Sequence, residues 1–191
     1  MPKDWFNCAY LRQGSPRQQA AYAALEDLKV FTHLHPYSPV LTGTIPLDIE
    51  TEHSDLDIIC EARDLPTFEG HLNTIFGRYE RFGCKQATHS RHPSVVAQFH
   101  HAGFVIEIFG QPQPVTRQNA YRHMLVEARL LAIGGDEARR AIRQMKQNGV
   151  KTEAAFATYF CLEGDPYQVL LELGMLNNYE LRALLARRRY E

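Results

Sequence analysis

The first clear apolar pattern lies near the start of the chain. Residues 21–28 carry apolar side chains at helical spacing. Ahead of them, Ser15 is a typical helix N-cap, Pro16 suits the first turn, and Gln18 completes a capping-box pattern. These signals predict a helix that begins directly after Ser15.

Short β-rich runs follow this helix. An apolar run at 40–41 ends at Gly43, and "SDLDIIC" at 54–60 predicts a strand bounded by polar residues. In "VVAQFHHAGFVIEIFG", at 95–110, two β-rich runs flank the dipeptide Ala102-Gly103. This arrangement predicts a hairpin whose second strand ends at Gly110.

Helical spacing dominates the segments that follow these runs. Asp64 is a candidate cap for a helix over 64–76, and from about residue 116 onward every segment has a helical pattern. The breaks fall at Gly134-Gly135, Gly149, Gly164-Asp165-Pro166 and Asn177-Asn178. We therefore expect an α+β protein with a mixed β-sheet core, flanking helices and a helical C-terminal part.

Length and charge refine this picture. The chain has 191 residues, 45% of them hydrophobic, which is enough for one substantial core or one domain with a helical extension. We expect an N-terminal helix and α/β core over 1–114, and a helical part over 115–191 that packs on it. With 21 basic and 22 acidic residues the net charge is −1, so net charge gives no indication of a nucleic-acid partner.

The four cysteines are widely spaced and form no CxxC pair, which favours a reducing compartment and no structural zinc. The first residues have neither the basic region nor the apolar run of a signal peptide. No stretch reaches the roughly 18 to 20 apolar residues of a membrane span. We expect a cytoplasmic protein with no membrane partner.

Two aspartates interrupt the apolar strand predicted at 54–60. On a strand, Asp55 and Asp57 would share one face while Leu56 and Ile58 take the other. At a rise of roughly 3.3 Å per residue, the two aspartate Cα atoms would lie about 6 to 7 Å apart. Like charges this close repel each other unless a cation joins them, and Mg²⁺ prefers oxygen ligands.

A third acid lies in the predicted hairpin. Glu107 is the only charged residue in the apolar run "FVIEIFG", where an acid is costly unless it is paired, hydrogen-bonded or bound to metal. If this strand lies beside 54–60, Glu107 completes a cluster of three acids. Upstream, Gly43 allows close backbone approach to an anion, and the Thr44 hydroxyl can hold a phosphate.

Gly43-Thr44 and the stretch "SDLDI", which begins ten residues after Thr44, resemble the signature of the nucleotidyltransferase superfamily, which includes DNA polymerase beta and small antibiotic nucleotidyltransferases. With "PVLTGTIPL" and "QNAYRHMLVEARLL", the chain is similar to an uncharacterised bacterial family within it. The resemblance implies a nucleotidyltransferase-like sheet and transfer of a nucleoside monophosphate from a nucleoside triphosphate to an unidentified acceptor. It implies that Asp55, Asp57 and Glu107 are catalytic and bind Mg²⁺, as one ion or two, and that Gly43 and Thr44 contact the β- and γ-phosphates.

The chain departs from that signature in three ways. Thr44 replaces the usual serine, Glu107 replaces the commoner aspartate, and residues 48–52 carry acids where many small members have basic residues. Two alternatives therefore stay open. One is a catalytically silent nucleotide- or partner-binding module of the same fold, and the other is a metal-dependent phosphohydrolase.

Further candidates lie on the helix predicted after the sheet. Arg122 and Arg129 are seven residues apart and share a face, where they can neutralise a triphosphate or be ordinary surface residues. We take Arg122 as a candidate nucleotide-binding residue. His123 and Glu127 are one helical turn apart, a spacing that fits either a metal pair or, more commonly, a simple polar contact.

Overall fold

The computed structural model describes residues 3–89 and 92–188, and the chain within them forms two units. The first runs through Asp48 and continues from His53 to Tyr121, and we call it the sheet unit. The second, the helical unit, contains Ile49–Glu52 and the chain from Arg122 onward. The domain division expected at 114/115 stays a prediction.

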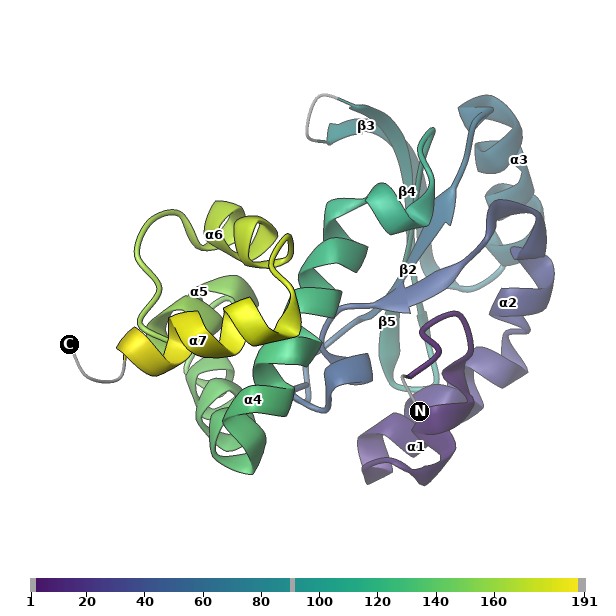
Figure 1. Cartoon of the computed structure of the whole chain (residues 1–191). Coiled ribbons are helices and arrows are strands. Elements are labelled where there is room, and N and C mark those ends of the chain that lie inside the picture. The colour runs from purple at the N-terminus through teal and green to yellow at the C-terminus, as the bar shows by residue number, and fades with distance from the viewer. Residues whose placement is uncertain (1–2, 90–91, 189–191) are drawn as a thin grey trace. The chain divides into compact units, whose positions relative to one another are not determined.

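The sheet unit is built on five strands in the order β1-β2-β5-β4-β3 (Figure 1). β2 and β5 pair in parallel, whereas the other neighbouring strands pair antiparallel. The mixed sheet and its helices confirm the predicted α+β class. The strands are β1 (Val40–Thr42), β2 (Leu56–Glu61), β3 (Glu80–His89), β4 (His92–His101) and β5 (Phe104–Gln111).

The predicted hairpin joins β4 to β5. Ala102 and Gly103 both have positive φ, 49° and 77°, as the two central residues of a type I′ turn require. β5 continues to Gln111, one residue beyond the expected end at Gly110. β3 was not predicted from the sequence.

Helices α1, α2 and α3 pack on one face of the sheet, and Figure 1 shows α2 and α3 together on that side. The capping box is confirmed: Ser15 Oγ accepts from the Gln18 N–H (3.2 Å), and Gln18 Oε1 accepts from the Ser15 N–H (3.1 Å). Asp64 caps α3 as predicted, accepting from the Thr67 N–H at 3.0 Å. The helices of this unit are η1 (Cys8–Gln13), α1 (Pro16–Asp27), α2 (Val30–His33), η2 (His35–Tyr37), η3 (Ile45–Leu47), α3 (Leu65–Phe76) and η4 (Val115–Arg117).

The core of the sheet unit lies between these helices and the sheet. Leu56 and Ile58 of β2, with Ile106 and Ile108 of β5, are fully buried in it. Because side chains alternate along a strand, the residues between them point to the opposite face. The core therefore decides which face of the sheet carries Asp57 and Glu107.

The helical unit follows the predicted breaks. Its helices are α4 (Asn119–Gln147), which starts in the sheet unit, α5 (Thr152–Tyr159), α6 (Pro166–Leu173) and α7 (Asn178–Arg188). At the predicted Gly134-Gly135 break, α4 is kinked rather than ended, with Gly135 at φ 64° and ψ −156°. Among the described residues, no helix has the length and apolar character needed to cross a membrane.

Candidate functional site

Asp57 and Glu107 lie side by side on the two parallel strands. They are direct register partners of the β2–β5 pair and lie on the face opposite the core. Both are half-buried, whereas Ile58 and Ile106 are fully buried on the other face. The sequence left the adjacency of these strands open, and the structure brings the two acids together.

Asp55 lies one residue before β2, so the strand prediction for 54–60 was wrong at its start. The polar pair Ser54-Asp55 has no ladder partner, because the pairing of β2 with its neighbours begins only at Leu56 and Asp57. Burial raises the pKa of the Asp55 carboxyl, and the charge of His100 partly offsets that rise. His100, from β4, therefore belongs to the electrostatic surroundings of the site, although the sequence did not single it out.

Gly43 lies against the carboxylate of Asp57. Its φ is +77°, and a Cβ built on it would collide with Oδ2 of Asp57. The neighbouring Thr42 pairs with Asp57 across β1 and β2, and its hydroxyl donates to the Asp57 carbonyl at 3.3 Å. Only glycine allows both this backbone conformation and this close approach. The structure thus brings predicted residues Gly43 and Asp57 together.

Thr44 takes the N-cap position of η3, yet its side chain makes no capping hydrogen bond. Its hydroxyl instead donates to Oγ of Ser54, 3.1 Å away. Ser54 directly precedes Asp55 in the chain. The predicted phosphate-binding hydroxyl is therefore attached to the segment that carries the first acid.

One row of residues crosses all five strands on the acid-bearing face. Register pairs join Thr42, Asp57, Glu107, Gln98 and Gly83 in that order. Gln98 is exposed, and a Cβ on Gly83 would meet nothing within 4 Å. Asp57 and Glu107 thus lie between the end of β1, where the Gly43 backbone lies against the Asp57 carboxylate, and the surface of β4 and β3, which carries the exposed amide of Gln98.

The carboxylates of the candidate site are chemically suited to bind a hard cation. Asp55, Asp57 and Glu107 offer carboxylate oxygens, the ligands that Mg²⁺ prefers. Across residues 3–89 and 92–188, however, no three His, Cys, Asp or Glu side chains already stand close enough together to hold a metal ion. These carboxylates would have to converge further when an ion binds.

The arginines predicted near the nucleotide belong to the helical unit. Arg122 is half-buried at the start of the longer segment of that unit, and its nucleotide-binding role stays a prediction. Arg129 donates through Nε to Asn178 Oδ1 at 2.8 Å and also to the Leu176 carbonyl. These bonds attach α4 to the start of α7, which favours a structural role for Arg129.

His123 and Glu127 form part of a buried polar cluster in the helical unit. His123 Nε2 donates to the Tyr167 carbonyl at 2.9 Å, and its Nδ1 lies 3.7 Å from Glu153 Oε1. Glu127 is 3% exposed, and its pKa is raised to about 8 by burial first and by Glu153 second, with Lys146 opposing. The cluster joins α4, α5 and α6 through polar contacts, which is the more common of the two interpretations of this spacing.

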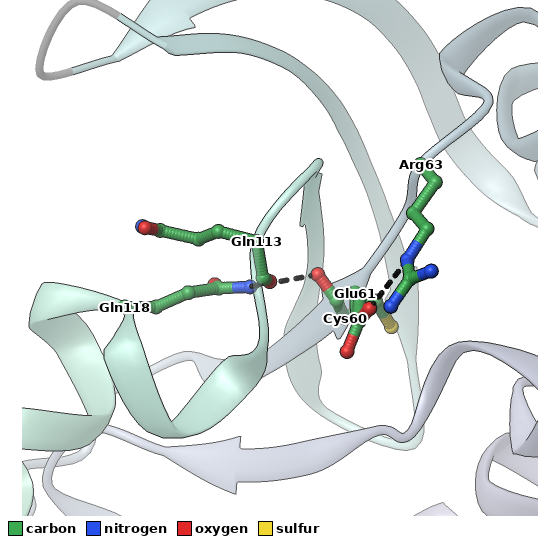
Figure 2. Close-up of polar contacts among 5 residues, drawn as sticks. All are labelled: Cys60, Glu61, Arg63, Gln113 and Gln118. Carbon is green, nitrogen blue, oxygen red and sulfur yellow. Dashed lines mark hydrogen bonds and ion pairs between the residues drawn. The ribbon is translucent and has the colours of Figure 1, made fainter.

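A buried glutamine connects the end of β5 to β2, as Figure 2 shows. The side-chain amide of Gln118 donates to the Cys60 carbonyl at 2.9 Å and to the Gln113 carbonyl at 3.1 Å. On the same strand end, Glu61 pairs with Arg63 at 2.8 Å. Sequence reasoning missed Gln118, because one glutamine after a Pro-rich turn gives no pattern that marks it as buried.

Solved structures with the same fold are nucleotidyltransferases. Cid1, an RNA terminal uridylyl transferase, matches with a TM-score of 0.53 and 13% identity over 87% of this chain and 52% of its own. The MgGTP-bound Cid1 poly(U) polymerase gives 0.54 and 14% over 87% and 53%. The polymerase core of TRAMP gives 0.50 and 13% over 94% and 59%. The chain thus spans about half the length of these proteins, and identities this low show the fold alone.

Sequence comparison identifies the family to which the chain belongs. No curated protein matches it. A family model described as a domain of unknown function, DUF4269, matches residues 23–173, which include β1, β2, β5 and most of the helical unit. With most of its length matched, and with a nucleotidyltransferase fold, this chain belongs to the DUF4269 family.

Proposed function

We propose that the protein is a metal-dependent nucleotidyltransferase that moves a nucleoside monophosphate from a nucleoside triphosphate to an acceptor. One observation carries the proposal. Asp57 and Glu107 are register partners on adjacent parallel strands, and the Gly43 backbone lies against the Asp57 carboxylate. Carboxylates beside a close backbone approach are the parts that phosphoryl transfer needs.

Asp55, Asp57 and Glu107 would hold Mg²⁺, as one ion or two. When bound, Mg²⁺ supplies charge neutralisation at the phosphates and lowers the pKa of an attacking oxygen. Gly43 admits a phosphate close to the backbone, and the hydroxyl of Thr44 donates to the β- or γ-phosphate. Glu107, with the longer arm, orients the acceptor hydroxyl.

The order of the strands gives the proposed reaction a direction. Gly43 and Thr44 lie at the end of β1, and the register-paired acids Asp57 and Glu107 lie on β2 and β5. In-line displacement places the attacking oxygen and the leaving pyrophosphate on opposite sides of the transferred phosphorus. The acceptor would therefore approach over β4, where exposed Gln98 is the register partner of Glu107.

The ligands bound in the structural neighbours support a nucleoside triphosphate as the donor. One Cid1 structure holds MgGTP and another holds Mg with 3′-dATP. The acceptor is unidentified. The near-neutral charge of this chain gives no sign that the acceptor is an RNA end. The proposal therefore concerns the donor half of the reaction.

The test measures affinity for MgATP and MgGTP by calorimetry, and pyrophosphate release with a panel of hydroxyl acceptors. We expect Asp57→Asn to weaken nucleotide binding at least tenfold and to abolish release. Glu69→Gln is the control, because Glu69 lies on α3, on the core side of the sheet, and pairs with Gln86. Equal affinity in wild type and Asp57→Asn would contradict the metal site.

A binding module without turnover is the second candidate. Two observations favour it: among the described residues no three-ligand group is ready-made, and residues 48–52 are acidic. Tight, Asp57-dependent binding of nucleotide with no pyrophosphate release from any acceptor would support this candidate. Release of phosphate with no acceptor present would instead indicate the phosphohydrolase.

A further inference from the structure

The hydroxyls of Thr44 and Ser54 form a pair between two segments that lie ten residues apart in the sequence. Thr44 Oγ1 and Ser54 Oγ are 3.1 Å apart, and both residues are half-buried. Thr44 follows Gly43 at the end of β1, and Ser54 directly precedes Asp55. The hydrogen bond therefore joins the proposed phosphate loop directly to the start of the acid-bearing segment.

A pair of hydroxyls has two hydrogens but needs only one for its mutual bond. Each hydroxyl is one donor and two acceptor lone pairs, and its hydrogen rotates to suit the surroundings. At this separation of 3.1 Å either hydroxyl can be the donor, because the hydrogens of both residues rotate about their C–O bonds. If Ser54 turns and donates to Thr44, the Thr44 hydrogen becomes available to an anion, and the chain of two bonds is strengthened cooperatively.

We infer that Ser54 is a positioning residue for the triphosphate, acting through Thr44. By donating to Thr44 Oγ1, it directs the Thr44 hydrogen at a phosphate oxygen and holds the Gly43-Thr44 loop at a fixed distance from Asp55. The ligand class is a polyphosphate chain, so Ser54 affects phosphate recognition and leaves base recognition unchanged. This inference rests on the proposed function and deepens it.

Calorimetry with MgATP and with magnesium tripolyphosphate, which has no base or sugar, tests this inference. We expect Ser54→Ala to weaken both ligands by about fivefold, the loss of one ordinary hydrogen bond. Ser54→Thr keeps the hydroxyl and should restore wild-type affinity. Thr74→Ala is the control, because its hydroxyl bonds the Gly70 carbonyl on α3, away from the acid-bearing face.

A double-mutant cycle separates action through Thr44 from a general structural effect. Thr44→Val removes the hydroxyl while keeping the shape, and Ser54→Ala in that background should cost no further affinity. Additive losses would overturn the inference, as would equal affinity of Ser54→Ala and wild type. If Asp57→Asn still loses binding in either of those cases, the proposed function survives. If the wild type binds neither ligand, both fail.

Discussion

At the scale of single residues, Gly43 carries a backbone constraint that belongs to the candidate site itself. Its φ of +77° is one that other residues rarely adopt, and the space where a Cβ would go is filled by the Asp57 carboxylate. A glycine in a sequence usually indicates only a turn. Here a side chain at position 43 would occupy the place of the Asp57 carboxylate.

Gly43→Ala should displace the Asp57 carboxylate and weaken MgATP binding at least tenfold. Gly103→Ala is a matched control, because Gly103 has the same φ of +77° and a Cβ there would meet nothing within 4 Å. Both variants take on backbone strain of about 1 kcal/mol, so a loss of affinity found only in Gly43→Ala reports the displaced carboxylate rather than the strain. Calorimetry and thermal unfolding check this, and equal nucleotide affinity in the two variants would contradict it.

At the scale of elements, sequence signals that act over a few residues correctly predicted the helix caps and the hairpin turn. Ser15 and Gln18 cap α1, Asp64 caps α3, and Ala102-Gly103 turns the hairpin, because each signal acts within a few residues of itself. β3 was missed because "ERFGCKQATH" is mostly polar and pairs only with β4, at the edge of the sheet. β3 forms a strand because it pairs with β4, and not because its own sequence has the pattern of a strand.

The candidate site was partly predictable for the same reason. The alternation around Asp57 and around Glu107 gave each residue its face, but the parallel pairing of β2 with β5 is a long-range contact that no local pattern encodes. Asp55 was assigned to the strand because it precedes Leu56, although the ladder begins only there. No role was predicted for Ser54, because its contact with Thr44 joins two positions ten residues apart.

The polar cluster of α4, α5 and α6 makes a prediction about stability at this same scale. The pKa of Glu127 is raised from 4.5 to about 8 in the folded protein. Between these two pH values the folded state therefore keeps a proton on Glu127 that the unfolded chain has released. The contribution of Glu127 to stability is therefore complete below about pH 4.5 and is lost as pH rises toward about 8.

Urea unfolding at several pH values checks this sign. Between pH 4.5 and 8, Glu127 should lower the free energy of unfolding of the wild type by up to about 1.4 kcal/mol per pH unit, and Glu127→Gln should remove that decline. Glu137→Gln, an exposed change on the same helix, should keep the wild-type slope. A Glu127→Gln slope equal to that of the wild type would show that Glu127 is ionised in the folded protein.

At the scale of the whole molecule, the chain combines a nucleotidyltransferase fold with half the length of its structural neighbours. The fold fixes where Asp57 and Glu107 lie but does not decide whether chemistry occurs there. Every role proposed for the sheet unit depends on those two carboxylates taking up a divalent ion. That dependence is the central claim.

The most direct test is a crystal structure of the protein soaked with Mn²⁺ and a non-hydrolysable nucleoside triphosphate, with the metal located by its anomalous scattering. We predict a peak at coordination distance, about 2.0 to 2.4 Å, from oxygens of both Asp57 and Glu107, with the triphosphate extending toward Gly43 and Thr44. A bound nucleotide with its metal away from these two carboxylates would contradict the account.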